Sequence, residues 1–168
     1  MHMVAAKAVA LKEALSPEFT AYAQAVVKNA QALANTLTQE GIDLLSGGTD
    51  NHLMTMDLRK QSLTGRDTQE MLESIGITAN KNTVPNDPQS PFVTSGIRLG
   101  TPALTTRGFT EQAMQEVARI IAETVKTRAT DAAGLRKRVE ALTNEFPLYP
   151  DLVKTNDACR VEEAVSHR

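Results

Sequence analysis

The sequence contains few of the residues that mark the common functional classes of small proteins. It has no tryptophan, one cysteine (Cys159), three histidines and only 4% aromatic residues. A single cysteine cannot form an internal disulfide. His2, His52 and His167 are too scattered along the sequence for the ligand spacing of a metal site. We therefore expect neither a disulfide nor a bound metal.

Charge and hydropathy argue against two further kinds of partner. The 168 residues include 18 basic and 20 acidic ones, which gives a formal net charge of -2 and no basic field to attract nucleic acid. The few aromatic residues do not form a platform on which bases stack. No apolar run approaches the roughly 20 residues that cross a bilayer, and no secretion signal is recognisable at the N-terminus. We expect a cytoplasmic protein without nucleic-acid or membrane partners.

Apolar periodicity and capping residues predict an α+β fold. The expected helices cover residues 4–15, 17–40, 64–75, 110–125 and 135–146, because apolar residues recur there at three- and four-residue steps. Short apolar segments at 42–45, 53–58, 77–80 and 97–99 are typical of strands. Few strands between helix-rich ends predict a small antiparallel or mixed sheet covered on one face by helices. Residues 151–168 lack a clear apolar period, and we expect a loosely ordered tail.

The first predicted helix differs from the others because it is apolar around most of its circumference. Only Lys7, Lys12 and Glu13 interrupt a surface of alanine, valine and leucine in residues 4–15. Such a helix is usually buried, which favours a partner domain or a second subunit that covers it. The alternative is an alanine-rich helix in water, since alanine tolerates exposure.

One arginine stands out as a candidate anion site. Arg98 lies between Gly96 and Gly100 and follows a loop with three prolines in residues 80–95. The glycines leave the backbone uncrowded, and a planar guanidinium can grip a carboxylate with two parallel hydrogen bonds. The alternative is an arginine on a solvent-facing strand with no ligand.

Three motifs carry a resemblance to a known family. They are Ser46-Gly-Gly-Thr-Asp-Asn-His, Asn80-Lys-Asn-Thr-Val-Pro-Asn-Asp-Pro and Ser95-Gly-Ile-Arg-Leu-Gly-Thr-Pro-Ala-Leu-Thr-Thr-Arg-Gly. In this order they resemble the C-terminal part of serine hydroxymethyltransferase, also called glycine hydroxymethyltransferase, and the similarity runs from the first residues to about Tyr149. The resemblance implies the small domain of a fold-type I pyridoxal-phosphate enzyme: interdomain helices in residues 1–40 and a C-terminal small domain in residues 41–150.

The resemblance also implies roles for individual residues. Arg98 matches the arginine that grips the carboxylate of the amino-acid substrate. Asn82, Ser90, Pro91 and Phe92 match the family's contacts to tetrahydrofolate. Considered without the family, Asn82 is a turn residue and Phe92 fills the core.

In the Gly-Gly-Thr-Asp-Asn-His motif at residues 47–52, we expect His52 to cap a turn.

The family holds pyridoxal phosphate as a Schiff base on a lysine that follows a histidine, and none of the eight lysines here does so. We therefore assign no catalytic residue and expect the chain to be inactive alone.

Two functions remain open at this point, besides a decayed gene product with no selected activity. The first is the C-terminal part of an enzyme that converts serine and tetrahydrofolate to glycine and methylenetetrahydrofolate. It would act beside a cofactor domain or a homologous subunit, and we expect it to self-associate. The alternative is a non-catalytic folate-binding or interaction module that docks on a full-length homologue.

Overall fold

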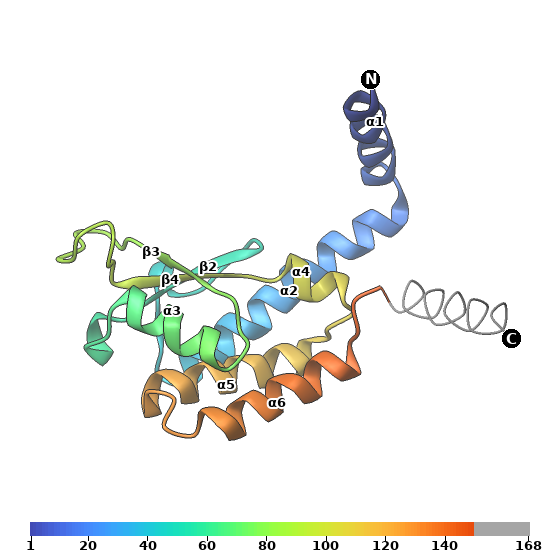
Figure 1. Cartoon of the computed structure of the whole chain (residues 1–168). Helices are drawn as coiled ribbons and strands as arrows, with labels where there is room; N and C mark the ends of the chain where they lie inside the picture. Colours follow the sequence, from blue (N-terminus) through green and yellow to red (C-terminus); the bar gives the residue numbers. More distant parts are fainter. Residues whose placement is uncertain (150–168) are drawn as a thin grey trace, which may run out of the picture.

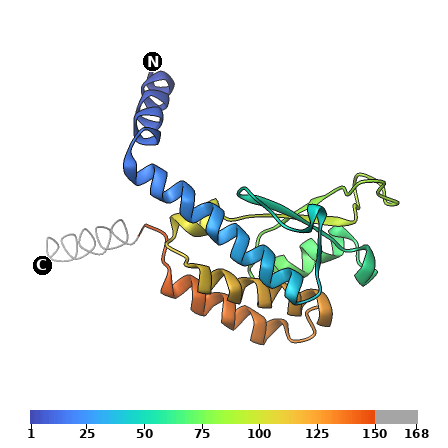
Figure 2. The same cartoon turned by 180° about the vertical axis from the view of Figure 1, so that it is seen from behind.

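The computed structural model describes residues 1–149, which form six α-helices and one sheet (Figures 1 and 2). The helices are α1 (His2–Ala14), α2 (Pro17–Gln39), α3 (Gly65–Ser74), α4 (Pro102–Thr106), α5 (Glu111–Thr127) and α6 (Ala132–Glu145). The strands are β1 (Asp43–Leu44), β2 (Leu53–Asp57), β3 (Asn80–Asn82) and β4 (Gly96–Gly100). Short 3-10 turns follow β1 at Leu45–Gly47 and β2 at Arg59–Gln61.

The strands form one antiparallel sheet in the order β1-β2-β4-β3. β4 is therefore a central strand, paired with β2 on one side and with β3 on the other. The α+β prediction with a small antiparallel sheet covered by helices is confirmed.

The two faces of the sheet differ because side chains alternate along each strand. Met54, Met56, Ile97 and Leu99 point into a core that they share with apolar side chains of α2, α3 and α5. In Figure 1 helices α5 and α6 lie below the sheet. The opposite face carries the polar residues of the strands together with Leu53. Among residues 1–149 no helix lies over it (Figures 1 and 2). This open face holds Arg98.

Side-chain caps begin three helices where the sequence predicts them. Ser16 Oγ accepts a hydrogen bond from Phe19 N at 3.1 Å, and Thr64 Oγ1 accepts one from Asp67 N at 3.1 Å. Thr110 Oγ1 does the same for α5. Each such cap contributes about 1 kcal/mol to stability.

The strand predicted to start within residues 77–80 exists, but β3 begins only at Asn80 and residues 77–79 lie outside it. The N–H of Ile77 donates to Leu72 O at 2.9 Å and so closes the C-terminus of α3. It is therefore not available to a strand ladder. Ile77 and Ala79 instead pack their side chains against the core from an irregular segment. The sequence also gave no indication of the short helix α4.

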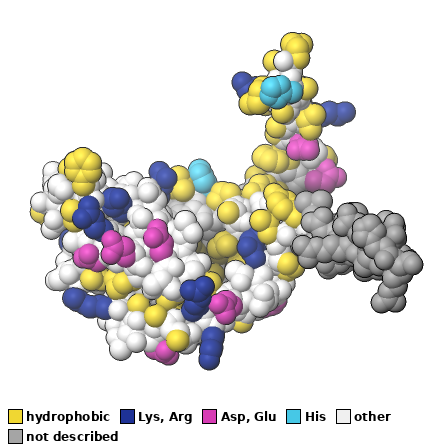
Figure 3. Space-filling view, in the orientation of Figure 1, with side chains coloured by type: hydrophobic (Ala, Val, Ile, Leu, Met, Phe, Trp, Pro, Cys, Tyr) yellow, Lys and Arg dark blue, Asp and Glu magenta, His cyan; other side chains and the backbone are white. Residues whose placement is uncertain are grey.

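Helix α1 projects from the rest of the chain, and none of its residues is buried (Figures 1 and 2). Val9 is 57% and Leu11 68% exposed. Figure 3 shows hydrophobic side chains gathered along this helix and where it meets α2. The partner that the sequence predicts for α1 stays a prediction.

The predicted division of the chain at residue 40 also stays a prediction. Helix α2 lies on the N-terminal side of that boundary, yet Leu33 and Leu37 in its second half belong to the same core as the sheet. The predicted tail at 151–168, including Cys159, lies outside the described residues. Within the described part, no helix is long and apolar enough to span a membrane.

Candidate functional site

Arg98 lies at the centre of the open face of the sheet. The strand register places it between Thr55 of β2 and Asn80 of β3. Its neighbours Ile97 and Leu99 are buried in the core, so the alternation of the strand turns Arg98 outward. The side chain is exposed, as a group that meets a ligand from solution must be.

The structure gives a further reason for glycine at position 96, besides the expected one of leaving room around Arg98. A Cβ on Gly96 would lie 2.8 Å from Val84 Cγ1 and 2.9 Å from Asn82 O and Met56 O. Gly96 is therefore needed for the close approach of the neighbouring strands, and not only to leave room around Arg98.

No carboxylate of residues 1–149 neutralises Arg98. Seven ion pairs form in this part of the chain, and none includes its guanidinium. The five N–H donors of a guanidinium need acceptors, and here water or a ligand must supply them. Carboxylates and phosphates both bind such a planar fork through two parallel hydrogen bonds.

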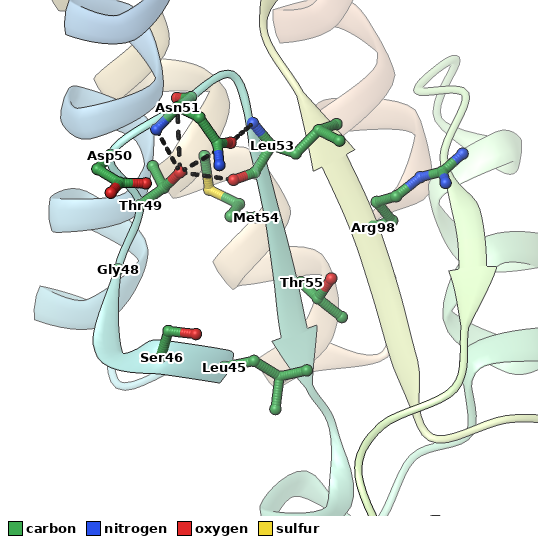
Figure 4. Close-up of a pocket in the computed structure, with 10 residues that line it drawn as sticks. All are labelled: Leu45, Ser46, Gly48, Thr49, Asp50, Asn51, Leu53, Met54, Thr55 and Arg98. Atoms are coloured by element: carbon green, nitrogen blue, oxygen red, sulfur yellow. Dashed lines mark hydrogen bonds between the residues drawn. The ribbon is translucent and has the colours of Figure 1, made fainter.

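A hollow of about 660 Å³ borders Arg98 on the β2 side (Figure 4). Its wall is the connection between β1 and β2, together with Thr55. Figure 4 shows the side chain of Arg98 directed away from the Thr49–Asn51 turn. A second hollow of about 490 Å³ borders Arg98 on the other side, where α3 contributes Gln69 and Glu73. A third hollow, of about 400 Å³, also has Arg98 in its lining and lies between the sheet, α5 and α6.

The turn beside the first hollow is held by Thr49 and Asn51. Thr49 Oγ1 donates to Leu53 O at 2.6 Å, and Asn51 Oδ1 accepts from Leu53 N at 2.8 Å. The expected capping role of His52 is wrong, because these two residues provide the side-chain bonds of the turn. His52 contributes its backbone carbonyl, which accepts from Thr101 N at 3.2 Å.

The residues expected to contact folate lie on the β3–β4 unit. Asn82 is in β3 opposite Gly96, on the same face as Arg98, and its Nδ2 donates to Thr83 O at 2.7 Å. Its interpretation as a turn residue is therefore wrong. Phe92 is 77% exposed, so it does not fill the core.

Ser90, Pro91 and Phe92 occupy the loop that joins β3 to β4, and all three are exposed. The carbonyl of Ser90 accepts from the N–H groups of Val93 and Thr94, both at 2.9 Å. In Figure 1 this loop extends beyond the ends of the strands. The structure thus brings Arg98 and Asn82 to one face, while residues 90–92 lie at the loop and not beside Arg98.

Asp87 organises the loop from within. Its carboxylate accepts from Val84 N at 3.2 Å, Gln89 N at 2.9 Å, Ser95 N at 2.9 Å and Ser95 Oγ at 2.6 Å. Burial raises the pKa of Asp87, but the hydrogen bonds from the Ser95 hydroxyl and the three N–H groups outweigh it and lower the pKa to about 2. The carboxylate therefore stays ionised and holds both ends of the loop.

Arg59, which follows β2, also binds the β3–β4 loop. The guanidinium of Arg59 bonds Asp57 at 2.6 Å and also donates to Pro85 O at 3.4 Å. The hydrogen bond from the Arg59 side chain is the main reason why the pKa of Asp57 is lowered.

Neither Asp87 nor Arg59 was identified from the sequence as a residue that holds the β3–β4 loop. Asp87 could have been found, because an Asn-Asp-Pro segment favours a side-chain bond to the N–H two residues on. Arg59 left no local signal, since it reaches a carbonyl 26 residues away.

The surroundings of Arg98 do not fit a Schiff-base cofactor held by this part of the chain. No lysine of the described residues lines any of the three hollows beside Arg98. Within residues 1–149, no group of three or more His, Cys, Asp and Glu side chains is placed to hold a metal ion.

The fold and the site define an α+β domain whose open sheet face presents an arginine that forms no ion pair with residues 1–149. The sequence matches the family model for serine hydroxymethyltransferase over residues 1–121, a range that includes Arg98 and the whole β3–β4 loop. The chain belongs to the serine hydroxymethyltransferase family, a transferase family of one-carbon metabolism.

Proposed function

We propose that this chain supplies the substrate contacts of a serine hydroxymethyltransferase. The reaction converts serine and tetrahydrofolate to glycine and methylenetetrahydrofolate. The observation that carries the proposal is Arg98, which has no carboxylate partner among residues 1–149 and lies on an open sheet face in a member of this family. Asn82 lies on the same face, which gives the site a second polar group.

Arg98 binds and orients the amino-acid substrate. Two parallel N–H donors of the guanidinium meet the two carboxylate oxygens, and this fixes the rotation of the substrate about its Cα. Orientation determines which bond at Cα reacts, so a loss of the planar fork affects more than affinity. The rigid strand β4, paired on both sides, holds the arginine in place.

The folate contacts come from β3 and from the loop that follows it. The Asn82 side chain uses one N–H on Thr83 O, and the rest of its amide can donate to and accept from a pterin edge. The exposed ring of Phe92 offers a flat apolar surface to an aromatic ligand. Ser90 and Pro91 border that ring along the chain.

The family uses pyridoxal phosphate and folate. Because no lysine of residues 1–149 lines the hollows beside Arg98, we assign the cofactor lysine to another domain or to a homologous subunit. The exposed apolar surface of α1 supports this assignment, since a helix that is apolar around most of its circumference is usually covered by another surface. The chain on its own is then inactive and contributes one side of a shared active site.

Calorimetry with a reduced folate tests the folate part of this proposal. We expect saturable heat when 5-formyltetrahydrofolate is added to the chain. Asn82→Ala removes the amide and should raise the dissociation constant about five- to tenfold, the effect of one hydrogen bond. Asn144→Ala, on an exposed part of α6, is the matched control and should leave the constant unchanged. If the unsubstituted chain gives no heat, the folate contacts are wrong.

The alternative function, a non-catalytic folate module, also predicts such heat. It differs in predicting no serine–glycine conversion when the chain is mixed with a cofactor domain.

A further inference from the structure

The first turn of α3 donates hydrogen bonds to three consecutive backbone carbonyls of the β3–β4 loop. The guanidinium of Arg66 donates to Phe92 O at 3.2 Å. The backbone N–H of Arg66 donates to Val93 O at 3.1 Å, and that of Gly65 donates to Thr94 O at 3.0 Å. Helix N–H groups that would otherwise face water are therefore used to hold the loop.

Close packing makes this contact specific. A Cβ on Gly65 would overlap Thr94 Oγ1 and would lie 2.6 Å from Gly96 O. Only glycine lets the helix approach the loop so closely. The loop and α3 are therefore fitted to each other.

Thr94 is strained where the loop enters β4. Its φ of 62° lies in the left-handed region, it is only 3% exposed, and its hydroxyl has no hydrogen-bond partner among residues 1–149. Such a conformation persists only where the surroundings enforce it, and strain of this kind is frequent at ligand-binding sites. Here the hydrogen bonds from α3 to the loop and from Ser95 to Asp87 hold Thr94 in this conformation.

We propose that Arg66 is a positioning residue for Phe92 in the folate site. This inference rests on the proposed function. The ring of Phe92 is exposed, so no packing fixes its direction, and its orientation depends on the backbone that carries it. By bonding Phe92 O, Arg66 fixes that peptide group and holds the ring ready for a flat aromatic ligand such as a folate. A loop ordered before binding loses less conformational entropy when the ligand arrives.

Two variants of Arg66 test this role. Arg66→Ala removes the donor, whereas Arg66→Lys keeps a donor on a long stem. Arg136→Ala is the matched control, because Arg136 is an exposed helix arginine with a partner, Glu140, on its own helix.

The first measurement is amide hydrogen exchange of Val93 and Thr94 in the full chain without ligand. We expect exchange about five- to tenfold faster in Arg66→Ala, as the loss of one hydrogen bond implies, and near-normal exchange in Arg66→Lys and Arg136→Ala. The second measurement is the dissociation constant for 5-formyltetrahydrofolate, which should rise about five- to tenfold in Arg66→Ala alone.

The outcomes separate the positioning role from the proposed function. If the unsubstituted chain does not bind the folate, the proposed function fails and the positioning role with it. If it binds, and Arg66→Ala exchanges faster but binds equally well, Arg66 has only a structural role and the inference is overturned. Unchanged exchange in Arg66→Ala would also overturn it, because the bond to Phe92 O would then not order the loop.

Discussion

Substitution of Asp87 is the most informative perturbation of the loop. The two carboxylate oxygens share four donors: Oδ2 accepts from Val84 N and Ser95 N, and Oδ1 accepts from Gln89 N and Ser95 Oγ. Asp87→Ala leaves all four without their acceptor. Asp87→Asn keeps one oxygen, and its amide can still donate to Ser95 Oγ once that hydroxyl turns round. Asparagine then loses mainly the bond from Gln89 N.

The expected magnitudes follow from this count. A net hydrogen bond contributes about 0.5–1.5 kcal/mol, and partly exposed donors recover some of the loss through water. We therefore expect Asp87→Ala to lower the free energy of unfolding by about 2–4 kcal/mol and Asp87→Asn by about 1 kcal/mol. Urea unfolding of the chain measures both. Asp50→Ala, at an exposed turn, is the control and should change the free energy by less than about 0.5 kcal/mol.

The contribution of Asp87 to the free energy of unfolding should also depend on pH. The pKa of Asp87 falls from an ordinary 3.8 to about 2 on folding, so its contribution is complete above about pH 5 and is lost as the pH falls through about 2. The full shift corresponds to roughly 2 kcal/mol, and solvent screening reduces this to about 1 kcal/mol. The stability difference between the unsubstituted chain and Asp87→Asn should therefore shrink over this window. A difference that stays constant from pH 5 to pH 2, or an alanine variant as stable as the asparagine one, would refute the reasoning.

Two further predictions concern other parts of the chain. Because Val9 and Leu11 of α1 are exposed and each would gain on the order of 1 kcal/mol by burial, the chain should self-associate, and glutamate at both positions should raise the monomer fraction in sedimentation experiments. A chain that is already monomeric at high concentration would contradict this. Gly65→Ala should destabilise the chain by about 1–3 kcal/mol in urea unfolding, since the new Cβ meets Thr94 Oγ1 and the carbonyl of Gly96. A neutral effect would show that α3 can move away from the loop.

Much of the fold could be predicted because local chemistry determines it. Ser16, Thr64 and Thr110 begin helices through bonds to N–H groups only three residues away. The position of β3 could not, since Ile77 is apolar like a strand residue but uses its N–H to close α3.

In the candidate site, too, local features could be predicted from the sequence and long-range contacts could not. The outward direction of Arg98 follows from its buried neighbours Ile97 and Leu99, which is a local pattern. The roles of Arg66 and Arg59 depend on carbonyls that are both 26 residues distant in sequence, and only the folded chain brings these groups together. Sequence patterns therefore indicate the binding residue, whereas the tertiary structure identifies the residues that hold the neighbouring loop.

The most direct test of the account is the Michaelis constant for serine in a mixture of this chain with the cofactor domain of a serine hydroxymethyltransferase. We expect serine–glycine conversion in the mixture. Arg98→Ala should raise the Michaelis constant about 10- to 100-fold, as the loss of a charge-assisted bidentate pair implies, and Arg98→Lys should raise it less because the charge remains. Equal constants for the unsubstituted chain and Arg98→Ala would show that Arg98 does not bind the substrate carboxylate.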